Sequence, residues 1–506
     1  MATEATSDSG ERDDLAGDQV DRSQRWKALA VCLVAGGMTL LDVSIVNVAL
    51  PSIREGLGAG DRTIQWVVAG YSLAFGVMLV PAGRLGDARS RRQVFIAGVV
   101  LFTLASAACG AAQSSLWIAL ARIVQGFGGG MITPQTSGFI QNLFKGKERG
   151  RAFGLFGMSI GVSTAIGPLL GGLLVQLGGA DFGWRLVFYV NAPIGVILVL
   201  LALKWLPSVP RGPKQSLDPV GVVLFGIAVL LVLLPVVEGE QGAPLSQRPW
   251  WLLGVAAAVL VAFYAWERWW ASRARETLVE LSLAKVRSYV FGITLGTLYF
   301  AGFTSLFIIV TLYLQSGLGY SALQAGATQM PFAVGSAVAA YVAGRLVNRF
   351  GRALVVVGLI LVAVGLVLVD IVVPLVEGDV GLKLAPFLLL AGLGSGMVIS
   401  PNVTLALDEV DNTKAGAGGG LLQTAQRMGS AVGVAVVLAQ FFDEVAATRG
   451  DYGEAISRSL HTTVGLVVVA LLIGLVDLLR RRTGGDHEPE HRGAPHPHGH
   501  GGAHAA

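Results

Sequence analysis

The sequence predicts an all-α integral membrane protein of fourteen transmembrane helices, arranged as six, two and six. Three observations support this prediction. The 506-residue chain is 53% hydrophobic and 14% charged, which departs from the usage of soluble proteins. Its apolar runs are about as long as the roughly 20 residues that cross a bilayer as a helix. A loop of glycine and arginine at residues 83–92 returns in altered form at 344–352, which indicates two related helix bundles.

Each apolar run of about 20 residues predicts one crossing. The predicted crossings are residues 27–51, 63–83, 93–112, 116–138, 152–175, 186–206, 218–237, 250–267, 289–314, 324–346, 353–373, 384–407, 415–439 and 459–479. Lysine and arginine gather in the loops on one side, as in Arg84, Lys145, Arg211 and Arg345. Basic loops stay in the cytoplasm, so this side and both termini are predicted to be cytoplasmic.

The two copies of the loop begin 261 residues apart, which is more chain than six crossings need. The surplus predicts two inserted helices, 218–237 and 250–267, after a Pro-rich linker that begins at Pro207. The predicted domains are a disordered cytoplasmic tail (1–25), a six-helix bundle (26–206), the linker with the inserted pair (207–270), a second six-helix bundle (271–482) and a disordered tail (483–506).

Composition and motifs exclude several classes of function. A net charge of +4 is too small to indicate nucleic-acid binding. No phosphate-binding Gly-x4-Gly-Lys-Ser/Thr pattern is present, and no polar stretch is long enough for a catalytic domain, so an enzyme and a cofactor are not expected. Six of the seven histidines lie in the last tail. Such a tract binds a metal in some proteins, but a disordered tail without a metal site is the preferred interpretation.

Asp42 is an acid inside the first predicted crossing, with apolar residues on both sides. A charged carboxylate there costs about 2.5–3.5 kcal/mol on insertion scales, so it should face a partner or a watery cavity. Burial disfavours the charged form, which predicts that Asp42 takes up and releases a proton. The alternative is a permanent pair with a cation, or a helix cap.

Arg122 lies in the fourth predicted crossing, where its guanidinium cannot be neutralised and must find acceptors inside the bundle. A role in proton coupling is the preferred interpretation, and an arginine that extends to the membrane surface is the alternative. Arg427, in the thirteenth crossing, is a similar case. Its expected partners are Asp408, Glu409 and Asp411.

The fifth predicted crossing has a face of small residues about four apart, which allows another helix to approach closely. Its members are Gly157, Gly161, Gly167, Pro168 and Gly171. Its expected complement in the tenth crossing is Gly335, Ala339 and Ala343. Proline lacks a backbone donor and should bend the helix. Ordinary tight packing is the alternative, and it explains the glycines but not the bend.

In the repeated loop, Gly83, Asp87 and Arg91 are the candidate conformational residues. The preference for basic residues on the cytoplasmic side explains the charges but not the repeated order of residue types. A two-bundle membrane protein with such loops is expected to be a transporter. Candidate residues of a substrate cavity are Trp66, Tyr71, Gln135, Asn191, Phe307 and Tyr313. Each of them is also compatible with packing or with a position at the membrane surface.

Five motifs carry a resemblance to a known family. They are Gly83 to Arg92, Leu41-Asp42 through Pro51, Arg122 with Gln125-Gly126, the small face of the fifth crossing, and Trp184 to Phe188 with Asn191-Ala192-Pro193. On these motifs, roughly residues 25–482 resemble the major facilitator superfamily, and more closely its fourteen-span drug:proton antiporter branch. The resemblance implies the major facilitator fold, and a proton-coupling role for Asp42 and Arg122.

The resemblance also implies a function. It is the export of hydrophobic or cationic drugs, or of an endogenous antibiotic, across the bacterial inner membrane by proton antiport and alternating access. The expected partners are a small-molecule substrate, protons and the lipid bilayer, with no nucleic acid and no required oligomer. The rivals are an importer or dedicated metabolite exporter of the same fold, and a membrane sensor that transports nothing.

Overall fold

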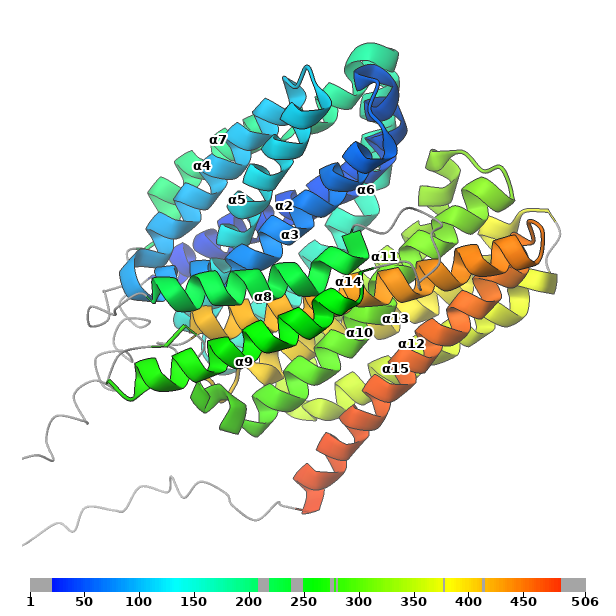
Figure 1. Cartoon of the computed structure of the whole chain (residues 1–506). Helices are drawn as coiled ribbons and strands as arrows, with labels where there is room; N and C mark the ends of the chain where they lie inside the picture. The colour runs from blue at the N-terminus through cyan, green and yellow to red at the C-terminus, as the bar shows by residue number, and fades with distance from the viewer. Residues whose placement is uncertain are drawn as a thin grey trace, which may run out of the picture.

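The computed structural model describes residues 21–207, 218–237, 249–273, 277–278, 281–375, 378–411 and 415–483. Over these ranges the chain forms the fourteen α-helices α2 to α15, joined by short π-helical and 3-10 turns (Figure 1). Most of the two predicted tails and most of the Pro-rich linker lie outside the described residues. Helix α2 begins at Arg22, so the predicted disordered tail 1–25 extends too far by at least four residues.

The first six helices pack together as one group, here called the first bundle. They are α2 (Arg22–Leu57), α3 (Asp61–Leu85), α4 (Arg91–Gly110), α5 (Ser115–Leu143), α6 (Gly146–Tyr189) and α7 (Asn191–Trp205). Helix α2 packs on α6, and α5 packs on α3 and α4. Gly179 interrupts α6 with a φ of 70°, a backbone that glycine adopts without a Cβ clash, so α6 consists of two helices that meet at a kink.

The last six helices form a second group, here called the second bundle. They are α10 (Arg287–Leu312), α11 (Ala322–Phe350), α12 (Arg352–Val372), α13 (Val380–Ala406), α14 (Ala415–Ala447) and α15 (Tyr452–Thr483). Helix α13 packs on α11 and α12, and α10 packs on α14 and α15. The second bundle therefore has its own core, which is lined by aromatic and aliphatic side chains of these helices.

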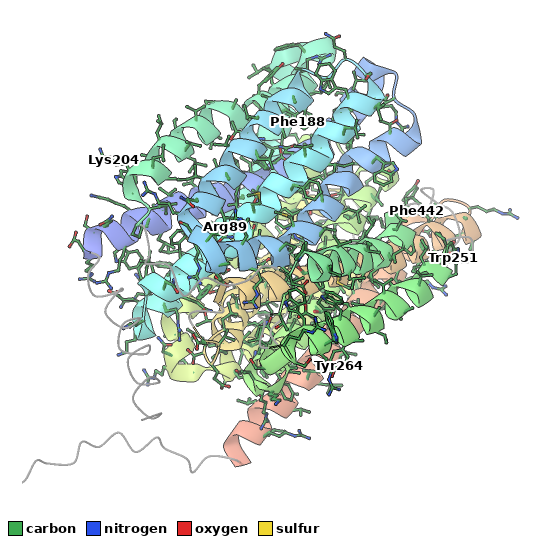
Figure 2. All side chains as sticks on the ribbon, turned by 60° about the vertical axis from the view of Figure 1, so that its left-hand side comes forward. Arg89, Phe188, Lys204, Trp251, Tyr264 and Phe442 are labelled. Atoms are coloured by element: carbon green, nitrogen blue, oxygen red, sulfur yellow. The ribbon has the colours of Figure 1, made fainter. Side chains whose placement is uncertain are left out.

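Two helices lie between the bundles in sequence and beside them in space. Helix α8 (Pro219–Val237) packs on α9 (Trp251–Ala271), on α3 and on α14 (Figure 1). Helix α9 presents many exposed side chains, including Trp251 and Tyr264 (Figure 2). The pair thus covers the line where α3 of the first bundle meets α14 of the second.

Eleven helical segments among the described residues are long and apolar enough to cross a membrane. One of them, Trp66–Gly110, runs through the π-helical turn η1 (Gly86–Ser90) and so contains two of the predicted crossings. Two further predicted crossings correspond to the shorter apolar helices Leu169–Gly179 and Pro219–Val232. The structure therefore establishes an all-helical fold with many membrane-length helices, and the count of fourteen crossings stays a prediction.

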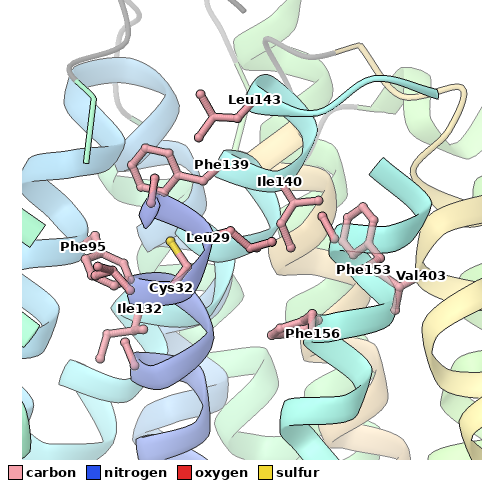
Figure 3. Close-up of a cluster of buried hydrophobic side chains, with 14 of the residues drawn as sticks. Leu29, Cys32, Phe95, Ile132, Phe139, Ile140, Leu143, Phe153, Phe156 and Val403 are labelled. Atoms are coloured by element: carbon pink, nitrogen blue, oxygen red, sulfur yellow. The ribbon is translucent and has the colours of Figure 1, made fainter. Parts of the chain in front are cut away.

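The two bundles contact each other at the end that carries the basic loops, here called the basic end. Arg149 of α6 forms an ion pair with Asp408, which follows α13. Gln141 Nε2 of α5 donates to the Leu407 carbonyl at 3.4 Å. A shared apolar core lies beside these contacts, and in it Val403 of the second bundle faces Phe153 of the first (Figure 3).

The small face of α6 differs in part from its prediction. A Cβ added to Gly161 would lie 3.1 Å from the Ala337 nitrogen of α11, so this glycine does sit on the tenth predicted crossing, as Gly157 does on Ala340. A Cβ on Gly167 would instead lie 2.2 Å from Ser44 of α2. One helix therefore uses its small residues against two neighbours, and the expectation that Gly167 packs on the tenth crossing is wrong.

The residues of α11 that were expected to face α6 are also wrong, because a neighbouring side of α11 faces it. A Cβ on Gly335 would meet Leu389 of α13, whereas a Cβ added to Gly344 would lie 2.5 Å from the Gly154 Cα of α6. The residues that face α6 are Ala333, Ala337, Ala340 and Gly344. Small residues occur on two sides of α11, and spacing alone does not say which side faces which neighbour.

Candidate functional site

Asp42 lies within α2 at the centre of a buried polar cluster in the first bundle. Its side chain is 0% exposed and accepts three hydrogen bonds. Oδ2 accepts from Arg122 Nη1 at 2.6 Å, while Oδ1 accepts from Gln125 Nε2 at 2.9 Å and from Asn191 Nδ2 at 2.8 Å. These donors come from α5 and α7, so the carboxylate connects three helices. All three partners are donors, which is the arrangement that an ionised carboxylate needs.

Arg122 is 1% exposed, so it does not extend to the membrane surface. Nη1 donates to both Asp42 and Gln125 Oε1, and Nε donates to the Val67 carbonyl of α3 at 2.9 Å. The guanidinium also lies 4.3 Å from the ring centroid of Tyr71, where the negative face of the ring attracts a cation. Arg122, which belongs to α5, thus connects this helix to α2 through Asp42 and to α3 through the Val67 carbonyl.

The basic loops contain a second set of buried charges. Arg91 Nη2 lies 2.7 Å from Asp87 Oδ1, and Arg91 Nη1 donates to the Gly138 carbonyl of α5. Asp87 lies in η1, so this pair fixes the turn between α3 and α4 to the end of α5. At the matching place in the second bundle, Arg352 Nε lies 2.7 Å from Asp477 Oδ2 of α15.

The comparisons with known proteins agree with this architecture. Residues 32–434 match the Major Facilitator Superfamily. The chain belongs to this superfamily. It is therefore a multi-pass membrane transporter of small molecules and not an enzyme.

Three similar proteins illustrate the relationship of this major facilitator transporter. A probable actinorhodin transporter of Streptomyces coelicolor is 37% identical over 83% of the chain and 73% of its own length. The puromycin resistance protein pur8 of Streptomyces alboniger is 34% identical over 90% of the chain and 89% of its own length. The crystal structure of the human organic anion transporter MFSD10 is similar in fold, with a TM-score of 0.64 and 15% identity over 89% of this chain and 99% of that one.

The six candidate cavity residues of the transporter do not lie in one place. Tyr71 and Asn191 join the Asp42 cluster, whereas Gln135 binds the Ala82 carbonyl near the end of α3. The other three are dispersed. Trp66 packs against an apolar cluster formed by residues of α3, α8 and α9, Phe307 lies in an aromatic cluster of α10, and Tyr313 lies in the π-helical turn at the end of α10.

The expected partners of Arg427 are wrong. Asp408 binds Arg149, and the Arg427 guanidinium instead lies 4.6 Å from the ring centroid of Phe75 on α3. The helix around Arg427 runs away from the basic end, so the side chain does not reach the acids there. The side chain of Pro168 is outside the described residues, although α6 is helical at that position.

The sequence analysis gave Asp42 and Arg122 as two separate candidates, Asn191 as a candidate cavity residue and Gln125 as part of the Arg122 motif, but it did not predict that these side chains meet. Gln125 bridges the two charges, and Asn191 is held by Ser106 at 3.1 Å while it donates to Asp42. Gln125 follows Arg122 by three residues, which places both on one face of a helix, and this spacing was the available signal. No spacing relates Asn191 to Asp42, because α7 and α2 are far apart in sequence.

Proposed function

We propose that this transporter exports a hydrophobic drug or an endogenous antibiotic across the bacterial cytoplasmic membrane in exchange for protons. The observation that carries the proposal is the buried Asp42 carboxylate with its three donors. The relatives support the direction of transport, since one is a resistance protein and another is a tetracenomycin C resistance and export protein of Streptomyces glaucescens.

Proton uptake by Asp42 requires the cluster to rearrange. A proton on either carboxylate oxygen would place an O–H group against an N–H donor, so at least one donor must leave. If Arg122 leaves, a buried guanidinium loses its counterion and needs new acceptors. Because the donors lie on α5 and α7, their departure shifts these helices relative to α2. Protonation and helix movement are therefore coupled within the first bundle.

The proposed cycle is alternating access between two bundles of six helices, with α8 and α9 outside them. We assign the basic end and both termini to the cytoplasm, since basic loops stay on that side. In this assignment the Arg149–Asp408 pair and the contact of Gly161 with α11 close the cytoplasmic side. Opening it would separate α6 from α11, as expected for bundles that rock around a central site.

Replacing Asp42 by asparagine tests the proposal. A drug-susceptibility panel on a knockout and an overexpressing strain identifies a substrate, and inside-out vesicles then report proton release when this substrate is added. Asp42→Asn removes the titratable group while it keeps the size of the side chain. We expect proton-driven accumulation to fall to the level of vesicles without the protein.

Asp370→Asn is the matched control. Asp370 lies on α12 and its Oδ2 is 2.9 Å from His461 Nε2, so it is also an aspartate in a helix with a basic side chain within contact distance. It belongs to the second bundle and has no contact with the Asp42 cluster. Transport by Asp370→Asn should resemble the wild type. Substrate-driven proton release by a folded Asp42→Asn protein would exclude Asp42 from coupling.

A further inference from the structure

Arg427 is a cation at the interface of the two bundles. It lies on α14 of the second bundle, and its guanidinium lies over the ring of Phe75, which belongs to α3 of the first bundle. The contact lies beyond the packed basic end, where Gly420, two turns earlier on α14, touches Leu79 of α3. Arg427 therefore lies between the two bundles and away from the packed basic end, and substrates of alternating-access transporters bind between such bundles.

The charge of Arg427 has no counterion among the described residues. Arg427 is partly buried. Of the four buried arginines among the described residues, Arg91, Arg122 and Arg352 each have an aspartate partner, and Arg84 donates to the Thr277 carbonyl. Within the described ranges, by contrast, no hydrogen bond or ion pair links Arg427 to an acceptor, and Phe75 is its ring contact. An arginine inside a membrane protein stays charged, so its position is costly unless an anion binds there.

The buried acid Asp42 of the first bundle is not available to a cationic substrate. Both oxygens of Asp42 are occupied by donors, and its charge is balanced by Arg122. The pair is neutral as a whole, and Arg427 adds one positive charge on the other side of Tyr71 and Phe75, whose rings are 5.9 Å apart. The electrostatics of this interface thus favour an anion over a cation.

Two aromatic residues of α10 are linked to α14 one turn along from Arg427. One turn later on α14, the Ser430 hydroxyl shares a 2.8 Å hydrogen bond with Thr304 of α10 and contacts the Phe300 carbonyl at 3.3 Å. Phe300 and Phe303 are partly buried, and their ring centroids are 5.5 Å apart. Partly exposed rings of this kind bind planar aromatic molecules by offset or edge contacts.

We propose that Arg427 is the anion-binding residue of the substrate site, and that the site takes planar aromatic acids. The carboxylate or phenolate of the substrate accepts from the N–H edge of Arg427, and its rings pack on Phe300 and Phe303. A guanidinium binds a carboxylate through two parallel hydrogen bonds, which a lysine cannot reproduce. This assignment rests on the proposed export function, because it places the substrate between the bundles.

Binding to the purified full-length protein in detergent tests the assignment without a proton gradient. The probes are anthraquinone-2-carboxylate, its methyl ester and ethidium, followed by quenching of intrinsic tryptophan fluorescence. The ester keeps the rings and removes the charge, and ethidium reverses the charge. The wild type should bind the acid at least about tenfold more tightly than the ester, as expected for a charge-assisted hydrogen bond.

Arg427→Gln should weaken binding of the acid by about 10- to 100-fold and leave binding of the ester unchanged. Arg427→Lys keeps the charge without the planar fork, so it should recover part of the preference. Arg273→Gln is the matched control, because Arg273 also lies over an aromatic ring, that of Trp269, but on the exposed segment after α9. It should bind all three probes like the wild type.

Three outcomes would overturn the assignment. They are equal binding of acid and ester by the wild type, tighter binding of ethidium than of the acid, and an equal loss of acid and ester binding in Arg427→Lys. The comparison of probes on the wild type decides the matter even if Arg427→Gln does not fold. A protein that prefers the acid but shows no proton-driven transport would refute the proposed coupling and leave the anion site intact.

Discussion

Two buried arginine–aspartate pairs in this transporter have nearly the same geometry but different surroundings. Arg122 lies 2.6 Å from Asp42 and Arg352 lies 2.7 Å from Asp477, and all four side chains are at most 2% exposed. The first pair joins α2 to α5 inside the first bundle. The second pair joins the start of α12, directly after Gly351, to α15 at the basic end. Distance and burial therefore do not distinguish them.

The known connections of the two pairs do distinguish them. Arg352 also donates to Asn402 Oδ1, Asn402 Nδ2 donates to the Gly292 carbonyl, and Arg287 Nη2 lies 4.0 Å from Asp477 Oδ1, so these contacts stay within the second bundle. Arg122 instead lies over the Tyr71 ring, and Tyr71 adjoins Phe75, the ring that Arg427 of the opposite bundle covers. The first pair is thus connected to the interface that opens and closes in the proposed cycle. We infer that position relative to this interface separates the proposed coupling pair from a structural tether.

The largest expected effects come from Arg122→Gln and Arg352→Gln, which each remove the buried cation that lies within 2.7 Å of a buried aspartate. Asp477 also lies 4.0 Å from Nη2 of Arg287, but that side chain is 48% exposed. Each should cost about 3–5 kcal/mol of stability. Per folded molecule, however, Arg122→Gln should lose proton-driven export, whereas Arg352→Gln should retain it. Thermal unfolding in detergent and vesicle transport, normalised to folded protein, give the two quantities. Loss of coupling in a well-folded Arg352→Gln protein would show that the two pairs do not differ in role.

An intermediate effect on stability and transport is expected from a change at the contact between α6 and α11, where the two bundles meet. Gly161→Leu would force a side chain against Ala333 and Ala337 of α11, at a cost of about 1–3 kcal/mol for overpacking. Gly172→Leu on the same helix is the control, because a Cβ there meets nothing within 4 Å. We expect Gly161→Leu to insert in the membrane but to leak protons or substrate, and Gly172→Leu to behave normally. Full active export by Gly161→Leu would reject this contact as a gate.

Much of the helical architecture was predictable from the sequence, because apolar runs of membrane length and basic loops are local signals. Asp42 and Arg122 were predictable for the same reason, because a charged residue inside an apolar run can be recognised from the sequence alone. Their partnership was not, since it depends on the packing of α2 against α5. The roles of the Asn191 amide and the Val67 carbonyl were equally hidden, because polar groups without charge carry no comparable signal.

Two wrong predictions, for the partners of Arg427 and for the packing of Gly167, have a shared physical cause. Arg427 was expected to bind acids that are near it in sequence, but a helix carries a residue about 1.5 Å along its axis per position, so Asp411 and Arg427 lie on different levels of the bundle. Gly167 and Gly161 were assigned to one face, but they are six residues apart, which places them on different sides of α6. In both cases the sequence supplied the residue type, and only the packing of helices supplied the neighbour.

The smallest expected effect is at the Asp370–His461 pair, which tests whether distance or burial sets the energy of an ion pair here. Its 2.9 Å contact is similar to that of the two buried pairs, but the His461 side chain is 69% exposed and Asp370 is 16% exposed. Water and salt screen such a charge, so the coupling energy should be at most about 1 kcal/mol. Asp370→Asn, His461→Gln and the double variant form a cycle that isolates this energy from other effects of each change. A coupling as large as the cost of breaking the Asp42–Arg122 or Arg352–Asp477 pair would mean that geometry alone governs these pairs, and it would remove burial as the reason why those two matter.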